Sequence, residues 1–184
     1  MKACALTRFP FSCFFPALLQ ALLAPVSHAE DDAGWRSGTF IPPAAWREQP
    51  AELPAYPDEG RLIEAAVTTG NYPYRVYIDP ETLSVGADRV VRYTVVVTSA
   101  AGARNVAYEG IRCSTREYRR YAYGANGTWQ ALDDIPWERI RETGMGHYRY
   151  ALYRGYLCDT TSDTLKRDKI LRRLRYSRGE VLDE

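Results

Sequence analysis

The strongest structural signal in this sequence is the run Arg89-Val90-Val91-Arg92-Tyr93-Thr94-Val95-Val96-Val97-Thr98-Ser99. Two sets of side chains alternate along it, and Val91, Tyr93, Val95 and Val97 form the first set. β-Branched and aromatic residues favour strands, and alternation with a period of two places each set on one face of a sheet. The run therefore predicts a central strand that is packed on at least one face.

Shorter runs of strand-forming residues flank this stretch on both sides, and turn signals separate them. Short strands at hairpin spacing are typical of an antiparallel sheet in which each strand pairs with the next. The sequence therefore predicts a meander-like sheet over residues 62–132. The expected strands are 61–69, 72–79, 89–99, 105–114, 116–123 and 128–132, and the expected turns are Gly70-Asn71, Asp79-Pro80, Val85-Gly86-Ala87-Asp88, Ala101-Gly102 and Gly124–Gly127.

After Asp133 the pattern changes from strands to helices. Asp133-Asp134 can cap a helix that has Pro136 in its first turn and that buries Trp137 and Ile140 three residues apart. We therefore expect a first helix from residue 136.

Two further helices are expected downstream. Residues 147–158 fit helical and strand spacing alike, and we interpret them as a helix. Residues 163–175 form a clearer helix, because acids come early and bases come late, which complements the helix dipole. The predicted fold class is α+β: an antiparallel meander-like sheet packed by two or three C-terminal helices, with one disulfide.

The first 29 residues have the features of a secretory signal peptide. Lys2 and Arg8 give a basic start, Phe9–Ala24 is an uncharged and almost wholly apolar run, and Ser27-His28-Ala29 is a small-x-small cleavage site. The apolar run is shorter than the roughly 20 residues that span a bilayer. We expect cleavage after Ala29, a periplasmic location and no transmembrane segment in the mature chain; an uncleaved membrane anchor is the alternative.

The remainder of the chain predicts one domain preceded by an extended strap. Cleavage removes two of the 24 basic residues and none of the 23 acidic ones, so the mature chain is close to neutral and gives no general case for nucleic-acid binding. Residues 30–60 carry five prolines, which cannot donate to a strand ladder. We expect this strap to be anchored by Trp46 and Tyr56, and to be followed by a single α+β domain over 61–178 and an acidic tail over 179–184.

Cys113 and Cys158 are the two cysteines that remain after cleavage. An even number of cysteines in an exported protein indicates a disulfide, and with two cysteines only one pairing exists. A two-thiolate metal site and two free thiols are the alternatives. Cys4 and Cys13 lie in the leader, where lipidation is a further alternative to cleavage after Ala29.

The sequence contains no prominent catalytic motif. It has no Gly-x-Ser-x-Gly elbow, no His-Glu-x-x-His, no phosphate-binding loop and no EF-hand loop. His147 is the sole candidate base for a nucleophilic serine or cysteine in the mature chain. Paired carboxylates need no linear motif, so Asp134 and Glu138 are candidates for an acid–base pair. We expect a protein that is not an enzyme, with no catalytic residue, metal or cofactor.

Arginine and tyrosine are interleaved in two segments of the chain, 116–123 and 148–156. Both residue types are enriched in binding hot spots, and arginine pairs with aromatic faces and with anionic groups. The alternative is that one tyrosine face is core and that arginine stems cover it. The candidate binding surface comprises Arg116, Tyr118, Arg119, Arg120, Tyr121, Arg149, Tyr153 and Arg154. The expected partner is a protein or glycan of the cell envelope.

Six linked segments carry a family resemblance. They are Tyr77-Ile78-Asp79-Pro80, Leu83-Ser84-Val85-Gly86-Ala87-Asp88, Val91-Arg92-Tyr93-Thr94, Tyr108-Glu109-Gly110-Ile111-Arg112-Cys113, Arg116-Glu117-Tyr118 and Leu152-Tyr153-x-x-Tyr156-x-Cys158. Together they resemble the cryptic-neisserial-protein-like family, a group of exported proteins of Gram-negative bacteria with no established activity. The resemblance covers Trp46 to Cys158 and implies a periplasmic or outer-envelope location.

A shorter likeness to surface-adhesin protein E rests on a Tyr-x-Asp-Pro strand, a Val-Arg strand and a cysteine-bearing strand rich in arginine and tyrosine. It implies an antiparallel sheet flanked by helix and an adhesive role. The sequence as a whole predicts an exported envelope protein that acts as a non-enzymatic binding or interaction module. A carboxylate-dependent enzyme acting on cell-wall or glycan material and a surface adhesin are the two alternatives.

Overall fold

The structure of the protein is a computed structural model that describes residues 45–67, 72–161 and 163–176. The predicted signal peptide 1–29, the start of the strap, the Gly70-Asn71 turn and the predicted acidic tail lie outside the described residues.

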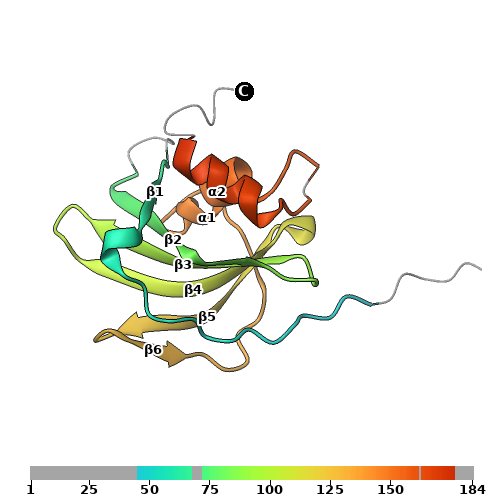
Figure 1. Cartoon of the computed structure of the whole chain (residues 1–184), viewed down its shortest axis with the longest axis horizontal. Helices are drawn as coiled ribbons and strands as arrows, with labels where there is room; N and C mark the ends of the chain where they lie inside the picture. The colour runs from blue at the N-terminus through green and yellow to red at the C-terminus, as the bar shows by residue number, and fades with distance from the viewer. Residues whose placement is uncertain (1–44, 68–71, 162, 177–184) are drawn as a thin grey trace, which may run out of the picture. The chain divides into compact units, whose positions relative to one another are not determined.

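Within the described residues, six strands form an antiparallel meander in which each strand pairs with the next along the chain (Figure 1). They are β1 (Ile63–Ala65), β2 (Tyr74–Val85), β3 (Val90–Ser99), β4 (Arg104–Arg112), β5 (Glu117–Ala125) and β6 (Thr128–Ala131). A two-residue strand, β7 (Glu138–Arg139), pairs with the start of β5. The predicted antiparallel meander is confirmed, and the valine-rich run forms a central strand, β3.

The C-terminal helices lie against one face of this sheet, which we call the helix side (Figure 1). α1 (His147–Leu152) continues directly into η3, a π-helical stretch over Tyr153–Leu157, and α2 (Arg167–Tyr176) follows. Two short 3₁₀ helices are η1 (Glu59–Arg61) and η2 (Cys113–Thr115). The described fold is thus mostly sheet, with few helices, and those that pack on it are C-terminal.

The helix-side core is built from alternate residues of the central strand. Val91, Tyr93 and Val95 of β3 are fully buried and belong to the same hydrophobic cluster as Leu152 of α1 and Ile170 of α2. Burying an aliphatic or aromatic side chain of this size contributes about 1.5–3 kcal/mol. The alternation read from the sequence therefore decides which face of the sheet receives the helices.

A disulfide joins Cys113 to Cys158, with 5.7 Å between their Cα atoms. It ties η2, at the end of β4, to the residue that follows η3, so the α1–η3 segment is fastened to the sheet at its far end. The two cysteines are 45 residues apart in sequence, and closing a loop of that length contributes roughly 4 kcal/mol in the chain-entropy model. The predicted pairing is confirmed, which removes the alternatives of a thiolate metal site and of free thiols.

The prediction of a helix that begins at residue 136 is wrong. Asp134 has φ = 52°, in the left-handed region, and so does not cap a helix, and residues 138–139 form β7. Ile140 is buried in the helix-side core, whereas the Trp137 indole donates a hydrogen bond to a residue on the other side of the sheet. These two apolar residues do not share one face of a helix. They contact opposite sides of the sheet.

The prediction that the strand breaks at Asp79-Pro80 is also wrong, because β2 continues through these two residues to Val85. The pairing register with β3 shifts between Asp79 and Ser84. Within this irregularity the Thr82 hydroxyl accepts a hydrogen bond from the backbone N–H of Thr94 at 3.0 Å. A bulge of this kind is one of the few places where a strand accommodates a proline.

Three other predicted segments compare with the structure as follows. Residues 147–158 are helical as α1 and η3, which confirms the helical interpretation. α2 begins at Arg167, four residues later than expected, because Asp163 instead pairs with Arg89. The first strand is shorter than predicted and covers Ile63–Ala65 only.

Residues 45–58, the described part of the strap that precedes η1, have no regular secondary structure and run along the opposite face of the sheet, the strap side (Figure 1). The Trp46 indole donates to a backbone carbonyl of the β2–β3 turn at 2.8 Å, and the Trp129 indole of β6 donates to a strap carbonyl at 2.9 Å. Gly124 of β5 allows close approach of Tyr56, because an added Cβ would lie 2.5 Å from the Tyr56 hydroxyl. These contacts hold the strap to the β2–β3 turn and across β5 and β6.

Candidate functional site

Arg119 and Arg120, which are neighbours in β5, point to opposite sides of the sheet. In the ladder with β4, Arg120 pairs with Glu109 and Ala122 pairs with the residue before Glu109. Tyr121 is therefore an extra residue that forms a β-bulge. Arg120 faces the helix side, while Arg119 and Tyr121 face the strap side, where both contact the strap.

Glu109 of β4 is the centre of a polar cluster on the helix side, and its side chain is 0% exposed. Arg149 of α1 donates to both carboxylate oxygens through Nε and Nη2, and Arg120 donates through Nε at 3.1 Å. The hydroxyls of Tyr148 and Tyr93 also donate, at 3.1 Å and 3.5 Å. A buried charge is tolerated when it is both paired and hydrogen-bonded, and Glu109 meets both conditions.

This cluster fixes the ionisation of its members. Burial acts to raise the pKa of Glu109, but the positive charges and hydrogen bonds of Arg149 and Arg120 outweigh it and hold that pKa below its usual value. Burial and the nearby Glu109 charge raise the pKa of Tyr93 and Tyr148 well above 10. At neutral pH the cluster therefore combines two guanidinium groups with one carboxylate and carries one net positive charge.

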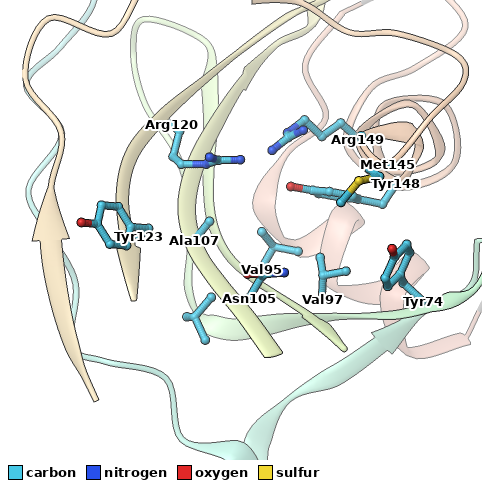
Figure 2. A pocket seen from close by; sticks show the side chains of 12 residues that line it. Tyr74, Val95, Val97, Asn105, Ala107, Arg120, Tyr123, Met145, Tyr148 and Arg149 are labelled. Atoms are coloured by element: carbon cyan, nitrogen blue, oxygen red, sulfur yellow. The ribbon is translucent and has the colours of Figure 1, made fainter. Parts of the chain in front are cut away.

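A pocket of about 290 Å³ opens beside the cluster, and we call it the helix-side pocket (Figure 2). Its apolar side is formed by Val95 and Val97 of β3 and by Ala107 of β4. The guanidinium groups of Arg120 and Arg149 point toward one another at one end of it (Figure 2). Arg149 is nearly buried, with 7% of its side chain exposed, whereas the Arg120 side chain is 40% exposed. The cluster thus forms a charged end to a cavity whose remaining lining is mostly apolar, with Asn105 as a further polar residue.

The rim of this pocket includes Tyr74, Tyr123 and Met145. Met145 is 73% exposed, a large value for an apolar side chain, and Tyr123 is exposed as well. The Tyr72 hydroxyl donates to the Met145 carbonyl at 3.0 Å and so fixes the backbone of the rim. Burial raises the pKa of Tyr72 to about 12, so this donor stays protonated across the physiological range.

A second carboxylate cluster lies on the strap side, around Glu48. Arg119 Nη1 donates to Glu48 at 2.9 Å, the Tyr121 hydroxyl donates at 2.7 Å and the Trp137 indole donates at 3.0 Å. Two of these donors come from β5 and the third from the segment between β6 and β7, while the acceptor belongs to the strap. The cluster therefore holds the strap against the sheet.

A buried ion pair between Arg92 and Asp88 extends this second cluster. Arg92 Nη2 lies 2.6 Å from Asp88 Oδ2 and 3.7 Å from Glu48. The backbone N–H of Gln49 donates to Asp88 at 2.8 Å. Burial acts to raise the pKa of Asp88, but the hydrogen bonds from Arg92 and from the Gln49 and Val90 backbone lower it below its usual value.

The structure places the predicted Arg/Tyr residues in separate groups. Arg120, Arg149 and Tyr118 come together on the helix side, where the Arg149 guanidinium lies 4.0 Å from the centre of the Tyr118 ring. Arg119 and Tyr121 come together on the strap side. Arg120 and Arg149 of the first group line the helix-side pocket, and the second group is engaged by the strap.

The other three predicted residues lie apart from both clusters. Arg116 donates to Glu142 at 2.6 Å, and its guanidinium lies 4.8 Å from the ring of Tyr150. Tyr153 is buried in the helix-side core and Arg154 is exposed. These three positions contribute to packing and to the surface of the α1–η3 segment.

Two central residues of the helix-side cluster, Glu109 and Tyr148, are missing from the predicted set. Glu109 stands between Ala107 and Ile111 in the alternation of β4, so an acid occupies an inward position of a strand. An inward acid requires cationic or hydrogen-bonding partners, and this signal could have identified Glu109 from the sequence. The sequence could not show that the partners are Arg120 and Arg149, because those residues are distant along the chain.

The residues considered for catalysis lie elsewhere. Asp134 and Glu138 are exposed, and Glu138 accepts a hydrogen bond from the Tyr118 hydroxyl at 2.9 Å. His147 is buried, and its Nδ1 hydrogen-bonds to the backbone carbonyl of Glu142. Among the described residues, no group of three or more His, Cys, Asp or Glu side chains is placed to bind a metal ion. None of the helices in the described ranges is both long and apolar enough to cross a membrane.

Comparison with known proteins identifies one family. Neither the curated proteins nor the solved structures contain a significant match to the chain. No comparison supports the likeness to surface-adhesin protein E. The model of the CNP1-like family matches residues 42–175, in agreement with the resemblance to the cryptic-neisserial-protein-like family. Since this match covers most of the sequence, the chain belongs to the CNP1-like family.

Proposed function

We propose that this protein is a non-enzymatic binding module of the bacterial cell envelope and that it binds a small-molecule ligand in the helix-side pocket. The observation that carries the proposal is the pocket itself, an apolar cavity of about 290 Å³ that ends at two arginines held in place by a buried carboxylate. Ligand sites are typically mostly apolar cavities of roughly 300–1,000 Å³ with a few well-placed polar groups.

The chemistry of the cluster supports binding over catalysis. Glu109 is fully buried, and two arginines and two tyrosines donate to its carboxylate, so it is poorly placed to take a proton from a substrate. Its role in the proposal is to orient Arg120 and Arg149. Pre-organised donors of this kind favour binding because little side-chain entropy is lost when the ligand arrives.

A blocking substitution tests the proposed site. Ala107→Phe places a ring in the pocket, and Val97→Trp at its half-buried edge is a second blocking variant. We expect a small-molecule extract of the native envelope to raise the melting temperature of the wild-type protein and to leave both variants unchanged. Gln130→Phe, on the exposed surface of β6, is the matched control and should respond like the wild type. An equal response in all four proteins would exclude this pocket, and no response in any of them would remove the proposed function.

The proposed location is the periplasm. It is supported by the basic, apolar and small-residue pattern of residues 1–29 and by a disulfide, which persists in oxidising compartments. The intact mass of the protein purified from its own envelope fraction tests this. We expect a chain that begins at Glu30 and that gains two alkylatable thiols only after reduction. A chain that retains residues 1–29 or carries a lipid would overturn the proposal of a soluble periplasmic form.

A further inference from the structure

The charged end of the helix-side pocket has hydrogen-bond donors to spare. Arg149 uses Nε and Nη2, and Arg120 uses Nε, to bind Glu109. No described residue accepts a hydrogen bond from Nη1 of Arg149 or from either terminal nitrogen of Arg120. A terminal guanidinium nitrogen carries two N–H groups, so several donors from two arginines remain for an incoming acceptor. Figure 2 shows the two guanidinium groups pointing toward one another at this end.

A glycine keeps the approach to Arg149 open. Gly146 has φ = −82°, a value that any residue can adopt, so the backbone does not require glycine there. A Cβ at this position would lie 3.1 Å from Nη1 of Arg149 and would crowd it. The absence of a side chain at Gly146 therefore leaves space beside Nη1 of Arg149, the nitrogen that does not bind Glu109.

The charge of the site specifies the sign of the missing acceptor. Two guanidinium groups face a single carboxylate, and the nearby Tyr148 stays protonated because burial raises its pKa. None of the described residues that line the pocket is acidic. One anionic group on a ligand would neutralise the remaining positive charge, and a planar or tetrahedral group of oxygens suits donors from two guanidinium groups.

The remainder of the pocket calls for an apolar body. Val95, Val97 and Ala107 present only carbon atoms from their side chains, and the exposed Tyr123 and Met145 border the opening. The volume of about 290 Å³ lies just below the roughly 300–1,000 Å³ that is typical of ligand sites, which calls for a small ligand. A fully polar anion such as inorganic phosphate would leave this apolar surface in contact with water.

From these features we infer that the ligand is a small amphipathic oxyanion, whose carboxylate or phosphate group binds Arg120 and Arg149 and whose apolar body lies on Val95, Val97 and Ala107. This inference rests on the proposed function, since it names the ligand class of the same pocket. The two oxyanion sources share the same recognition chemistry, and the experiment below separates them.

Three matched probes test the inference on the full chain purified from its envelope fraction. Hexanoate, pentyl phosphate and hexanamide share one five-carbon alkyl chain as the apolar body and differ in the head group. A hydrogen bond to a charged group contributes about 1.5–3 kcal/mol, so titration calorimetry should give at least one anionic probe an affinity roughly tenfold or more above that of hexanamide. The tighter of the two anions identifies the head group as carboxylate or phosphate.

Other binding results would overturn either the oxyanion assignment or the proposed function. Equal binding of hexanamide and both anions would overturn the oxyanion assignment while leaving a ligand-binding pocket. Binding by none of the probes, together with a response of the wild-type protein to envelope extract that Ala107→Phe abolishes, would overturn this inference alone. Binding by none of them, with no response to extract, would remove the proposed function as well.

Two substitutions locate the anion. Arg120→Gln should weaken binding of the tighter anion roughly tenfold and leave hexanamide unchanged, whereas Arg154→Gln, an exposed arginine outside the pocket, should change neither. Gly146→Ala should weaken anion binding without removing a charge, because it crowds Arg149, and it keeps the test valid if Arg120→Gln melts early. Unchanged anion affinity in both variants, with the wild-type melting temperature retained, would overturn the assignment.

Discussion

On the helix side of the sheet, Glu109 binds Arg149, Arg120 and two tyrosines, and on the strap side Glu48 binds Arg119, Tyr121 and a tryptophan. The chemistry of the two clusters is nearly the same, but their positions are not. Glu109 belongs to a central strand and is fully buried, whereas Glu48 belongs to a segment without regular structure and is 17% exposed. The first cluster leaves donors facing a pocket, and the second uses its donors to hold a strap.

The difference arises from which element supplies the carboxylate. When the acid lies in the sheet, its partners from β5 and α1 must reach inward to it, and they form one end of a cavity. When the acid lies in the strap, the sheet supplies the partners and the strap covers them. The same residue types can therefore build a site on one side and close a surface on the other.

The largest effect is expected from removing the acid on the helix side. Glu109→Ala leaves two buried or half-buried guanidinium groups without their carboxylate, and we expect it to lower the free energy of unfolding by about 3–5 kcal/mol. Urea denaturation monitored by circular dichroism would measure the loss. Glu64→Ala, at an exposed position of β1, is the control and should change stability by no more than about 0.5 kcal/mol. A loss below about 1 kcal/mol for Glu109→Ala would show that the helix-side cluster is not a stabilising centre.

Removing the acid on the strap side should have a smaller and more local effect. Glu48→Ala takes the acceptor from three donors, two of which are near the surface, and we expect a loss of about 1.5–3 kcal/mol. Limited proteolysis should cut the strap within 45–58 more rapidly, while the far-ultraviolet spectrum of the sheet stays unchanged. A loss as large as that of Glu109→Ala, without faster cleavage of the strap, would mean that the two sides unfold as one unit and would end the contrast between them.

Acid should weaken both sides in the same direction. The pKa of Glu109 and that of Asp88 are lower in the folded protein than in the unfolded chain, so the unfolded chain takes up protons first as the pH falls. Their stabilisation is complete above the unfolded-state values of about 4, and it is lost as the pH falls through the folded-state values. The melting temperature should decline less steeply below about pH 4 in Glu109→Gln and in Asp88→Asn than in the wild type. Identical slopes in all three proteins would show that neither acid is linked to folding.

The smallest effects come from two tyrosine hydroxyls that differ only in their surroundings. Tyr121 donates to the part-buried Glu48, and Tyr118 donates to the exposed Glu138. We expect Tyr121→Phe to cost about 1 kcal/mol and Tyr118→Phe less than about 0.5 kcal/mol, measured by thermal denaturation. The reverse order would mean that the helix-side edge, and not the strap, depends on its tyrosine hydroxyl.

The sheet was predictable because its signals are local. The alternation in residues 89–99 and the turns between short strands specify an antiparallel meander without any knowledge of distant contacts. The segment after Asp133 was misjudged because the spacing of Trp137 and Ile140 fits a helix, while tertiary contacts place the two on opposite sides of the sheet. Local spacing cannot distinguish these two outcomes.

The site was only partly predictable for the same reason. The interleaved arginines and tyrosines were recognised, but a strict period of two does not predict the bulge at Tyr121. Without the bulge, Arg119, Tyr121 and Tyr123 would share one face; in the structure Tyr123 lines the helix-side pocket, while Tyr121 contacts the strap. The partners of Glu109 come from β5 and α1, and only the folded chain brings them together.

The bulge also has a consequence for how this sequence can change during evolution. A residue gained or lost in the longer hairpin loop at 100–103 can be accommodated within the loop, and such sites tolerate length variation. A residue gained or lost between Arg119 and Tyr123 shifts the register of the strand by one position. Every side chain of β5 beyond the change would then point to the opposite face of the sheet. Length in this part of β5 is therefore constrained more tightly than residue identity, and relatives that keep both sides of the sheet should align here without gaps.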